Sequence, residues 1–406
     1  MRILEIETFG RGGLTHYAYN LSAALADRGH EVTLATHAAY ELEEGDRPAP
    51  FPVLKVMGRW THRAPSWLPR FALNLMRKVE AIYDGFALAA TARRLRPDVV
   101  HVHCTNPVAL LYLKLLRRRG RPLVATAHVV TPHERIPFQT AVYRRLHGTG
   151  ELVIAHSRVD RQRLLDEFAV REERVTVIPH GDYGFFEGAD AAPRAPAAAR
   201  ESLGLAPDDE VALFFGYVRE YKGLDLLLDA WPAVAKARPK ARLVVAGDPV
   251  RLPPARRAEL EAAAERIGAI LHFGYIPFSE VTTYFDAADA LVMPYRHISQ
   301  SGVLFLALSV GVPVIATQVG ALPEMLDDGD SALLVPPEST AALADALVRA
   351  LGDPGLRARL AAGGRRVAAD HSWDSIAVRT EKAFATLLDP AETPLAAATA
   401  QPPRSR

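Results

Sequence analysis

Short apolar runs alternate with helical periods along the first half of the chain. The runs that predict strands are Ile3–Ile6, Val32–Thr36, Val99–His103, Leu123–Ala127, Leu152–Ala155 and Val175–Ile178. The periods that predict helices are Leu14–Arg28, Leu68–Leu95, Val108–Arg118 and Arg158–Phe168. Strands that alternate with helices in this way are typical of a doubly wound parallel sheet. We therefore predict a first α/β domain, Rossmann-like in build, over residues 1–184.

The pattern pauses at Ala189–Arg200, which reads ADAAPRAPAAAR, so we predict a linker over residues 185–200. A second Rossmann-like domain is predicted over residues 201–372. Its strands are Val211–Phe215, Arg242–Ala246, Ala269–Phe273, Asp289–Met293, Pro313–Ala316 and Ala332–Val335. Its helices are Leu224–Ala237, Pro254–Ile267, Ser279–Ala287, Val303–Val310 and Thr340–Leu351. We expect the two domains to face each other across a cleft, because such sheets bind ligands at the carboxyl ends of their strands. A helix over 373–388 could return to the first domain, and the low-complexity tail 389–406 is expected to be disordered.

The composition fits a globular protein and excludes several classes of function. The chain has 406 residues, of which 49% are hydrophobic, and its net charge of +1 argues against a dedicated nucleic-acid binder. Its one cysteine, Cys104, excludes internal disulfides and a cysteine-based metal cluster. His101 and His103 alternate on one predicted strand, but no third ligand is evident, so no metal site is predicted. The start MRILEIETFG indicates a strand rather than a signal peptide, and we find no apolar segment of 18 residues, so we expect a cytoplasmic protein.

A phosphate site is predicted at the start of the helix Val303–Val310, which lies between two apolar runs typical of buried parallel strands. Four small or polar residues precede the helix: Ser299, Gln300, Ser301 and Gly302. Such a segment leaves backbone N–H groups pointing in one direction, and the helix dipole adds partial positive charge there. The amides of Ser301, Gly302 and Val303 would then bind a diphosphate. An ordinary capped helix is the alternative.

Five stretches, in order, resemble glycosyltransferase family 4, which has the GT-B fold. They are GRGGLTHYAYNLSAALADRGHEV (Gly10–Val32), ELVIAHSRVDRQRLL with RVTVIPHG (Glu151–Gly181), FFGYVREYKGLDLLLDA (Phe214–Ala230), SVGVPVIATQVGALPEML (Ser309–Leu326) and ALLVPP (Ala332–Pro337). The resemblance implies that a sugar moves from a nucleotide diphosphate sugar to an acceptor hydroxyl with retention of configuration. No acidic metal triad is visible, so we expect no metal or other cofactor.

Two cations follow the first predicted strand of the second domain. A leaving diphosphate gains negative charge as the sugar departs, and cations on a fixed loop stabilise that charge most in the transition state. The resemblance assigns this role to Lys222. The family usually has an arginine two positions before Arg219, where this chain has Tyr217, so Arg219 is a shifted substitute. Alternatively, YKG before a helix could be an exposed helix start.

The family's paired glutamates, eight positions apart, are missing from this chain. Counted back from the GVPV motif, the second falls on Leu306 and the first on Ile298. In the family the second normally accepts hydrogen bonds from the ribose and the first touches the sugar, which an apolar side chain cannot do. Either Ser299 and Gln300 take over, or the donor is held differently. Glu324, in GALPE, could replace the missing acceptor or cap the next helix.

Further contacts are expected from the first domain. Gly12 and Gly13 follow the first strand, where glycine lets the backbone approach a phosphate or sugar closely. His128 ends the strand LVATAHV, and the family has a histidine in this T-x-H setting, which implies contact with the donor sugar or the reacting centre. A purely structural histidine is the alternative. His16 and His133 are candidates for acceptor contacts.

A basic and aromatic segment, Arg59–Lys78, reads RWTHRAPSWLPRFALNLMRK. Aromatic residues with flanking cations suit a membrane interface with anionic headgroups. The segment therefore suggests peripheral contact with the inner face of the cell membrane and a lipid-linked acceptor. The alternative is a helix that packs its apolar face on the sheet and leaves its cations in water.

Together these features predict a glycosyltransferase that moves a hexose-like sugar from a nucleotide sugar to a glycan or lipid-linked acceptor. One alternative is a non-catalytic GT-B partner in glycan assembly, which the missing glutamates favour. Another is a nucleotide-sugar epimerase of similar shape, against which the first-domain glycine loop and the R-x2-K loop argue.

Overall fold

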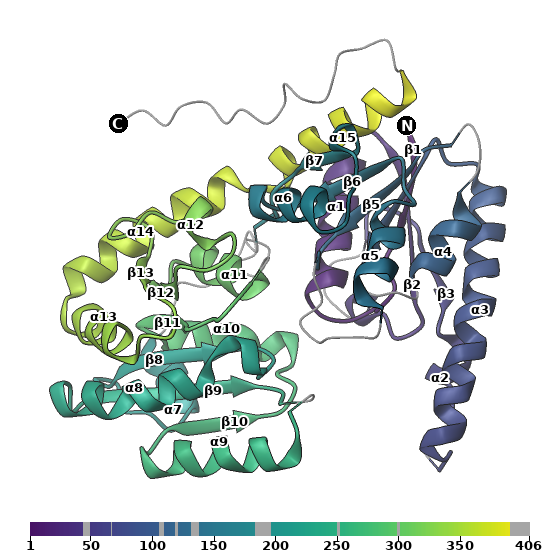
Figure 1. The fold of residues 1–406 in the computed structure, drawn as a ribbon. Coiled ribbons are helices and arrows are strands. Elements are labelled where there is room, and N and C mark those ends of the chain that lie inside the picture. The colour runs from purple at the N-terminus through teal and green to yellow at the C-terminus, as the bar shows by residue number, and fades with distance from the viewer. Residues whose placement is uncertain are drawn as a thin grey trace. The chain divides into compact units, whose positions relative to one another are not determined.

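The computed structural model describes residues 1–43, 49–65, 67–104, 109–117, 121–130, 138–182, 196–249, 252–298 and 301–389 (Figure 1). The chain forms two compact units. The first unit comprises Met1–Gly181 together with the chain from Ser372 onward, and the second comprises Asp182–His371.

The first unit is built on a seven-stranded parallel sheet in the order β3-β2-β1-β4-β5-β6-β7. Its strands are β1 (Arg2–Ile6), β2 (Glu31–His37), β3 (Val53–Met57), β4 (Val99–Cys104), β5 (Leu123–Ala127), β6 (Leu152–Ala155) and β7 (Val175–Val177). Strand β3 was not predicted. It is an edge strand in which only Val56 and Met57 are buried, so its apolar pattern is short.

Helices cover both faces of this sheet. They are α1 (Gly13–Asp27), α2 (Arg59–His62), α3 (Arg70–Leu95), α4 (Ala109–Leu116), α5 (Gln139–His147), α6 (Arg158–Asp166) and α15 (Trp373–Leu388), with short 3-10 turns at Glu41–Glu43 and Glu172–Arg174. Apolar residues of α1 and α15 share one core cluster, and those of α3 to α6 share the cluster on the other face. The C-terminal helix α15 also bonds to α1, through an ion pair of 2.7 Å between Arg28 and Glu381.

The second unit is built on a six-stranded parallel sheet in the order β10-β9-β8-β11-β12-β13. Its strands are β8 (Glu210–Phe215), β9 (Ala241–Gly247), β10 (Ile270–Phe273), β11 (Ala290–Met293), β12 (Val314–Thr317) and β13 (Leu333–Val335). Its helices are α7 (Pro196–Ser202), α8 (Leu224–Ala237), α9 (Pro254–Arg266), α10 (Phe278–Ala287), α11 (Gly302–Val310), α12 (Leu322–Met325), α13 (Thr340–Gly352) and α14 (Pro354–Asp370), with a 3-10 turn at Glu220–Lys222.

The predicted linker overlaps a helix. Residues 185–195 lie outside the described residues, but α7 occupies the rest of the predicted linker and continues to Ser202. Ala199 in α7 is buried, and the Arg200 guanidinium pairs with Asp289 at 2.8 Å. The alanine-rich composition that suggested a linker also favours a helix, and this helix of seven residues packs within the second unit.

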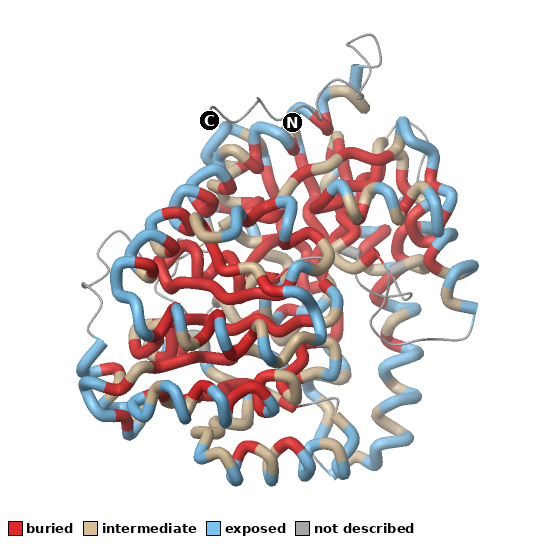
Figure 2. Tube along the Cα trace, turned by 60° about the vertical axis from the view of Figure 1, so that its left-hand side comes forward, coloured by how far each residue is buried: buried red, intermediate tan, exposed pale blue. Residues whose placement is uncertain are grey.

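The inner strands of both sheets are buried along their length, and Figure 2 draws such buried segments in red, whereas the edge strands β3 and β10 are largely of intermediate exposure. In β8, for example, Val211, Leu213 and Phe215 belong to one core cluster, whereas Ala212 and Phe214 belong to the other. This two-residue alternation is the geometry of an extended strand, and burial on both sides explains the continuous apolar runs. None of the helices in the described ranges combines the length and apolar character needed to cross a bilayer.

The strand orders place a switch point in each sheet. In the first unit the order reverses beside β1, which lies between β2 and β4, and in the second it reverses beside β8, which lies between β9 and β11. Ligands of open α/β sheets bind outside the carboxyl ends of the strands at such points. The segments that follow β1, β4, β8 and β11 are therefore where functional side chains are expected.

Candidate functional site

A glycine turn follows β8 at the switch point of the second unit. Gly216 has φ +93°, which L-residues with a side chain rarely adopt. A Cβ atom there would lie 2.9 Å from Lys222 Nζ and 3.2 Å from Val303 Cγ2. The turn therefore brings the 3-10 segment with Lys222 next to the start of α11, as the sequence predicted for a phosphate site.

Lys222 is buried, with only 6% of its surface exposed. Its Nζ donates to the Phe215 carbonyl at 3.3 Å and lies 5.4 Å from the centre of the Tyr295 ring. Burial, and to a smaller extent the charge of Arg219, lowers the pKa of Lys222 to about 7. The alternative of an exposed helix start is therefore wrong for Lys222. A buried ammonium in these surroundings gains strongly from an added anion.

Arg219 lies beside this lysine and is partly exposed. Its guanidinium carbon is 5.7 Å from the centre of the Tyr217 ring, a cation–π distance. Tyr217, at the position of the family's usual arginine, is 44% exposed. The loop thus has one buried and one accessible cation.

Helix α11 begins at the other side of the glycine turn. Ser301 is its N-cap, and its hydroxyl accepts from the Leu304 amide at 3.3 Å. Gly302 and Val303 are the first two residues, whose amides have no partner within a helix. The alternative of a capped helix is thus correct for Ser301, while the two following amides can still bind an anion. Ser299 and Gln300 lie outside the described residues.

The two positions that replace the family's glutamates are core positions. Leu306 and Ile298 are each 4% exposed and belong to one apolar cluster of the second unit. The Ile298 carbonyl approaches Gly320 so closely that a Cβ there would lie 1.8 Å from it. Glu324 is exposed in the first turn of α12, where an acidic side chain complements the helix dipole.

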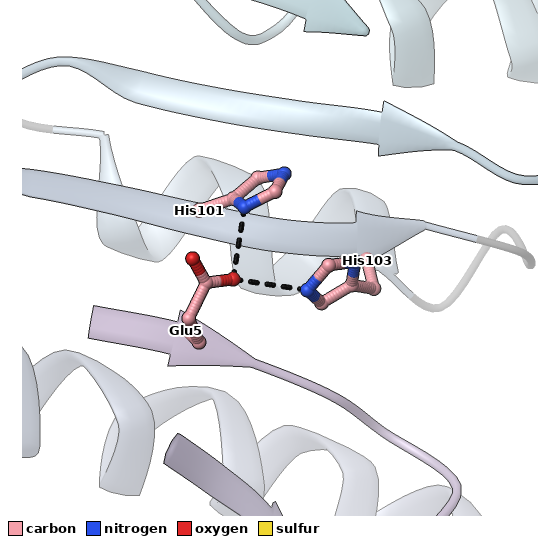
Figure 3. Close-up of side chains that lie close together, drawn as sticks. All are labelled: Glu5, His101 and His103. Carbon is pink, nitrogen blue, oxygen red and sulfur yellow. Dashed lines mark hydrogen bonds and ion pairs between the residues drawn. The ribbon is translucent and has the colours of Figure 1, made fainter. Parts of the chain in front are cut away.

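In the first unit a buried carboxylate lies at the switch point. Glu5 of β1 pairs in register with His101 of β4, and its Oε2 lies 2.8 Å from His101 Nδ1 and 2.9 Å from His103 Nε2 (Figure 3). All three residues are fully buried. Burial raises the pKa of Glu5, but the two histidines outweigh it and hold that pKa at about 2.

The expectation that His101 and His103 have no third partner is therefore wrong. Glu5 adds the third group of a type that can ligate a metal, from a strand that the sequence did not connect with β4. Glu5 Oε2 contacts a ring nitrogen of each histidine directly, and His101 Nε2 lies 2.7 Å from the Thr126 hydroxyl. The group is thus a buried carboxylate–imidazole cluster of a composition that could also ligate a metal, and the expectation of no metal stays a prediction.

His128, just after β5, is only partly exposed, and both of its ring nitrogens face other histidines. Its Nε2 lies 3.1 Å from His103 Nδ1, and its Nδ1 lies 3.2 Å from His156 Nε2. His156, just after β6, has its Nδ1 2.9 Å from the Ile178 carbonyl. Both ring nitrogens of His128 thus have partners within the first unit, at the sheet edge where a ligand was expected, and its contact with a donor sugar stays a prediction.

Aromatic rings lie next to His128 and its neighbouring histidines. The ring of Tyr17 in α1 lies with its centre 4.7 Å from that of His128 and 4.8 Å from that of His180, and Trp373 of α15 lies 5.1 Å from Tyr17. Burial lowers the pKa of His128 well below its usual value and that of His156 to about 3, and the neighbouring histidines lower both further.

Sequence reasoning missed Glu5, Tyr17, His156 and His180. The sequence did hold a signal for the histidines, which was their position along the chain. A histidine stands at or just after the carboxyl end of four successive strands, in the stretches HVH, AHV, AHS and PHG. Adjacent parallel strands bring such residues together.

The glycine loop after β1 is closed by a side chain. Gly12 has φ +77° and is the N-cap of α1, which begins at Gly13. The Gly12 amide donates to Glu41, and His16 Nε2 lies 3.4 Å from the same carboxylate oxygen. The Gly12 amide, which was expected to meet a ligand, therefore already donates to a carboxylate. His133 lies outside the described residues.

Two family models match the chain. One, described as Glycosyltransferase Family 4, covers residues 11–181, and one described as Glycosyl transferases group 1 covers residues 209–353. A D-inositol 3-phosphate glycosyltransferase from Frankia alni is 30% identical over 409 residues, which span 94% of this chain and 96% of the relative. One from Segniliparus rotundus is also 30% identical, over 90% of this chain and 82% of its own length.

Solved structures share the fold. Sucrose-phosphate synthase from Thermosynechococcus elongatus has a TM-score of 0.74 at 23% identity, covering 95% of this chain and 98% of its own. Anabaena Alr3699/HepE in complex with UDP-glucose has a TM-score of 0.74 at 20% identity, over 95% and 100%. The predicted fold class, two Rossmann-like parallel sheets of GT-B type, is confirmed.

Proposed function

The chain belongs to glycosyltransferase family 4 and is a glycosyltransferase, and from that premise we propose that it moves a sugar from a nucleotide diphosphate sugar to a glycan acceptor with retention of configuration. The observation that carries this proposal is Lys222, buried at the switch point of the second unit beside the start of α11. Both matching models are of glycosyltransferases, which decides against the epimerase. A UDP-sugar is the first donor to test, since HepE was solved with UDP-glucose.

In the proposed reaction the bond between the anomeric carbon and the diphosphate oxygen breaks, and the acceptor oxygen forms the new bond on the same face. The leaving diphosphate gains charge, which Lys222 and the amides of Gly302 and Val303 would stabilise. The acceptor hydroxyl proton leaves with the departing diphosphate. These cationic and amide groups support a metal-independent reaction.

The test compares Lys222→Ala with Lys236→Ala, which removes an exposed lysine of α8 in the same unit. With a panel of nucleotide sugars, and D-inositol 3-phosphate as the first acceptor, Lys222→Ala should reduce turnover by about 10²-fold or more. Lys236→Ala should keep wild-type turnover. If Lys222→Ala matches the wild type, the assignment of Lys222 is wrong. If the wild type binds donors but transfers to no acceptor, a non-catalytic partner in glycan assembly becomes the better reading, as the apolar Leu306 and Ile298 would suggest.

We further propose that helix α3 holds the first unit on the cytoplasmic face of an anionic membrane, where a lipid-linked acceptor would be met. Five apolar side chains of α3, each at least 50% exposed, form one stripe along it: Phe71, Leu75, Val79, Ile82 and Phe86. At 100° per residue they fall within about 80° of arc, a narrow apolar face typical of an interfacial helix. The alternative of an apolar face packed on the sheet is wrong for this stripe.

The short helix α2 adds an aromatic group to that stripe. Buried Glu80 of α3 accepts from the amides of Trp60 and Thr61, and Asp84 accepts from the Gly58 amide at 3.1 Å. These bonds hold Trp60 with its ring 4.7 Å from that of Tyr83. Trp67 is 75% exposed nearby in the chain. The exposed cations of the segment are Arg59, Arg63, Arg70, Arg77 and Lys78.

Vesicle flotation tests the membrane proposal. Each cation near an anionic surface contributes about 1 kcal/mol, so binding should need anionic lipid and weaken as salt rises. Changing Arg63, Arg70, Arg77 and Lys78 to Gln should remove the salt-dependent part, and Phe71→Ser with Leu75→Ser should remove the part that salt does not screen. A wild-type protein that ignores anionic vesicles at low salt would point to a soluble acceptor.

A further inference from the structure

Four hydrogen bonds connect Glu5 with the backbone across the first sheet. They join Glu5 to His103 (2.9 Å), His103 to His128 (3.1 Å), His128 to His156 (3.2 Å) and His156 to the Ile178 carbonyl (2.9 Å). Each imidazole uses both ring nitrogens, one for each neighbour. We call these four groups and the terminal carbonyl the histidine chain.

Both ends of the histidine chain are acceptors. An ionised carboxylate and a carbonyl oxygen can only accept, so each of the four bonds needs one proton from an imidazole. A neutral imidazole carries one N–H, and three neutral imidazoles therefore supply three protons for four bonds. Without one more proton, two lone pairs would face each other in a buried place, or one bond would be lost.

We propose that the histidine chain holds one surplus proton, shared by His103, His128 and His156, and uses it to place positive charge at the sheet edge when an anionic group of a ligand binds there. The proton can reside on any of the three rings with all four bonds kept. Transfer of one proton across the His103–His128 bond moves the cation from His103 to His128, and transfer across the next bond moves it to His156. The chain as a whole stays neutral because Glu5 is ionised.

The surroundings of the chain suit one delocalised charge. The titratable groups that face it are Glu5 from β1, His101 from β4, Tyr17 from α1 and His180 from the segment after β7. Burial and the neighbouring histidines lower the pKa of each ring and so oppose any cation in the chain. The ionised Glu5 raises the pKa of His103 and offsets this cost for one surplus proton, whereas a second cation would have no such partner. His128 is the only one of the three rings that is partly exposed, so it is where a phosphate-like group could meet the charge.

Nitrogen-15 NMR of histidine-labelled protein measures the proton count directly. At neutral pH the nitrogen signals of the three rings of the wild type should together correspond to one imidazolium shared among them. Burial lowers the pKa of His147 to about 4, so this ring provides a neutral reference. In Glu5→Gln the amide nitrogen can donate to His103, so all three rings should become neutral. Glu7→Gln removes a buried carboxylate that accepts from the Phe9 and Gly10 amides, and it should leave the proton count unchanged.

A second variant acts at the other end in case Glu5→Gln does not fold. His156→Leu removes two bonds, and the two remaining rings can satisfy the other two bonds as neutral groups. Inorganic phosphate added to the wild type should shift His128 toward the imidazolium form and His103 toward the neutral form, and it should shift neither ring in Glu5→Gln.

Three neutral rings in the wild type, a protonated Glu5 carboxyl, or a bound metal detected by elemental analysis would each overturn the surplus proton. If the surplus proton is present but His128 does not respond to phosphate, the proposal that it places positive charge at the sheet edge is overturned. The inference rests on the proposed transferase site for its purpose, but the proton count is measured without turnover, so a failure of the proposed function is recognised separately.

Discussion

Each unit buries an ionisable group at the switch point of its sheet, but only in the first unit does that group have partners that can carry the opposite charge. In the first unit Glu5 meets His101 and His103 directly, and the charge is balanced inside the protein. In the second unit Lys222 contacts a carbonyl and an aromatic ring, and no carboxylate among the described residues pairs with it. The first arrangement is complete without a ligand, whereas the second leaves a cation that a diphosphate would complete. An unpaired buried charge destabilises the protein, so it marks a site where a ligand of opposite charge would bind favourably.

The difference should appear in two separate pH windows, although stability rises with pH in both, because both folded-state pKa values are lowered. The pKa of Glu5 is lowered from 4.5 to about 2, so its contribution to stability is present above pH 4.5 and is lost as the pH falls toward 2. The pKa of Lys222 is lowered from 10.5 to about 7, so its charged form weakens the fold. Stability therefore rises with pH between about 7 and 10.5 as Lys222 loses its proton.

The largest expected effect follows from this lysine. Lys222→Met keeps an apolar stem without the charge, so at pH 7 it should raise the free energy of unfolding by about 4 to 5 kcal/mol. The gain should shrink as the pH rises and vanish near pH 10.5. Denaturant unfolding at several pH values measures it, with Lys236→Met as the exposed control. Equal pH slopes in the wild type and Lys222→Met would mean that Lys222 is not held in a buried, unpaired state.

The second prediction concerns the stability of the second unit when it has to bury a carboxylate, as the first unit does at Glu5. Leu306→Glu places a charge in an apolar cluster, and it should destabilise the protein by about 3 kcal/mol or more. Leu306→Met, of similar volume, should cost less than about 1.5 kcal/mol. Melting curves and calorimetric nucleotide binding are measured together. A stable Leu306→Glu protein with altered nucleotide affinity would show that Leu306 faces the donor and not the core.

The third prediction removes the internal balance of the first unit. Glu5→Leu should lower the free energy of unfolding by about 3 kcal/mol at neutral pH, and this deficit should disappear between pH 4.5 and 2. Glu7 is a control of opposite sign, because burial raises its pKa and its charged form weakens the fold as the pH rises. Acid unfolding followed by circular dichroism distinguishes the two. The carboxylate–imidazole cluster would be wrongly assigned if Glu5→Leu kept the acid limb of the wild type.

Much of the fold was predictable because the strands are buried on both faces and read as continuous apolar runs. The helix Leu224–Ala237 was predicted with the bounds it has in the structure. Strand β3 was missed because an edge strand buries few side chains, and α7 because a short alanine-rich turn has no apolar period of its own. In the candidate site the sequence identified Lys222 and the start of α11, since both lie close in sequence to predicted strand ends. It did not identify the partners of His128.

The sequence by itself determined the two parallel sheets and the cationic loop after β8, because local apolar periodicity and short loops encode these features. Only the tertiary structure decided which side chains meet. Glu5 and His103 are 98 positions apart, and their contact depends on β1 and β4 being neighbours in the sheet. Likewise, the burial of Lys222, and so its lowered pKa, depends on the Tyr295 ring, which comes from a distant segment and lies against its Nζ. Charge in a protein is set by such surroundings, and surroundings are assembled only when the chain folds.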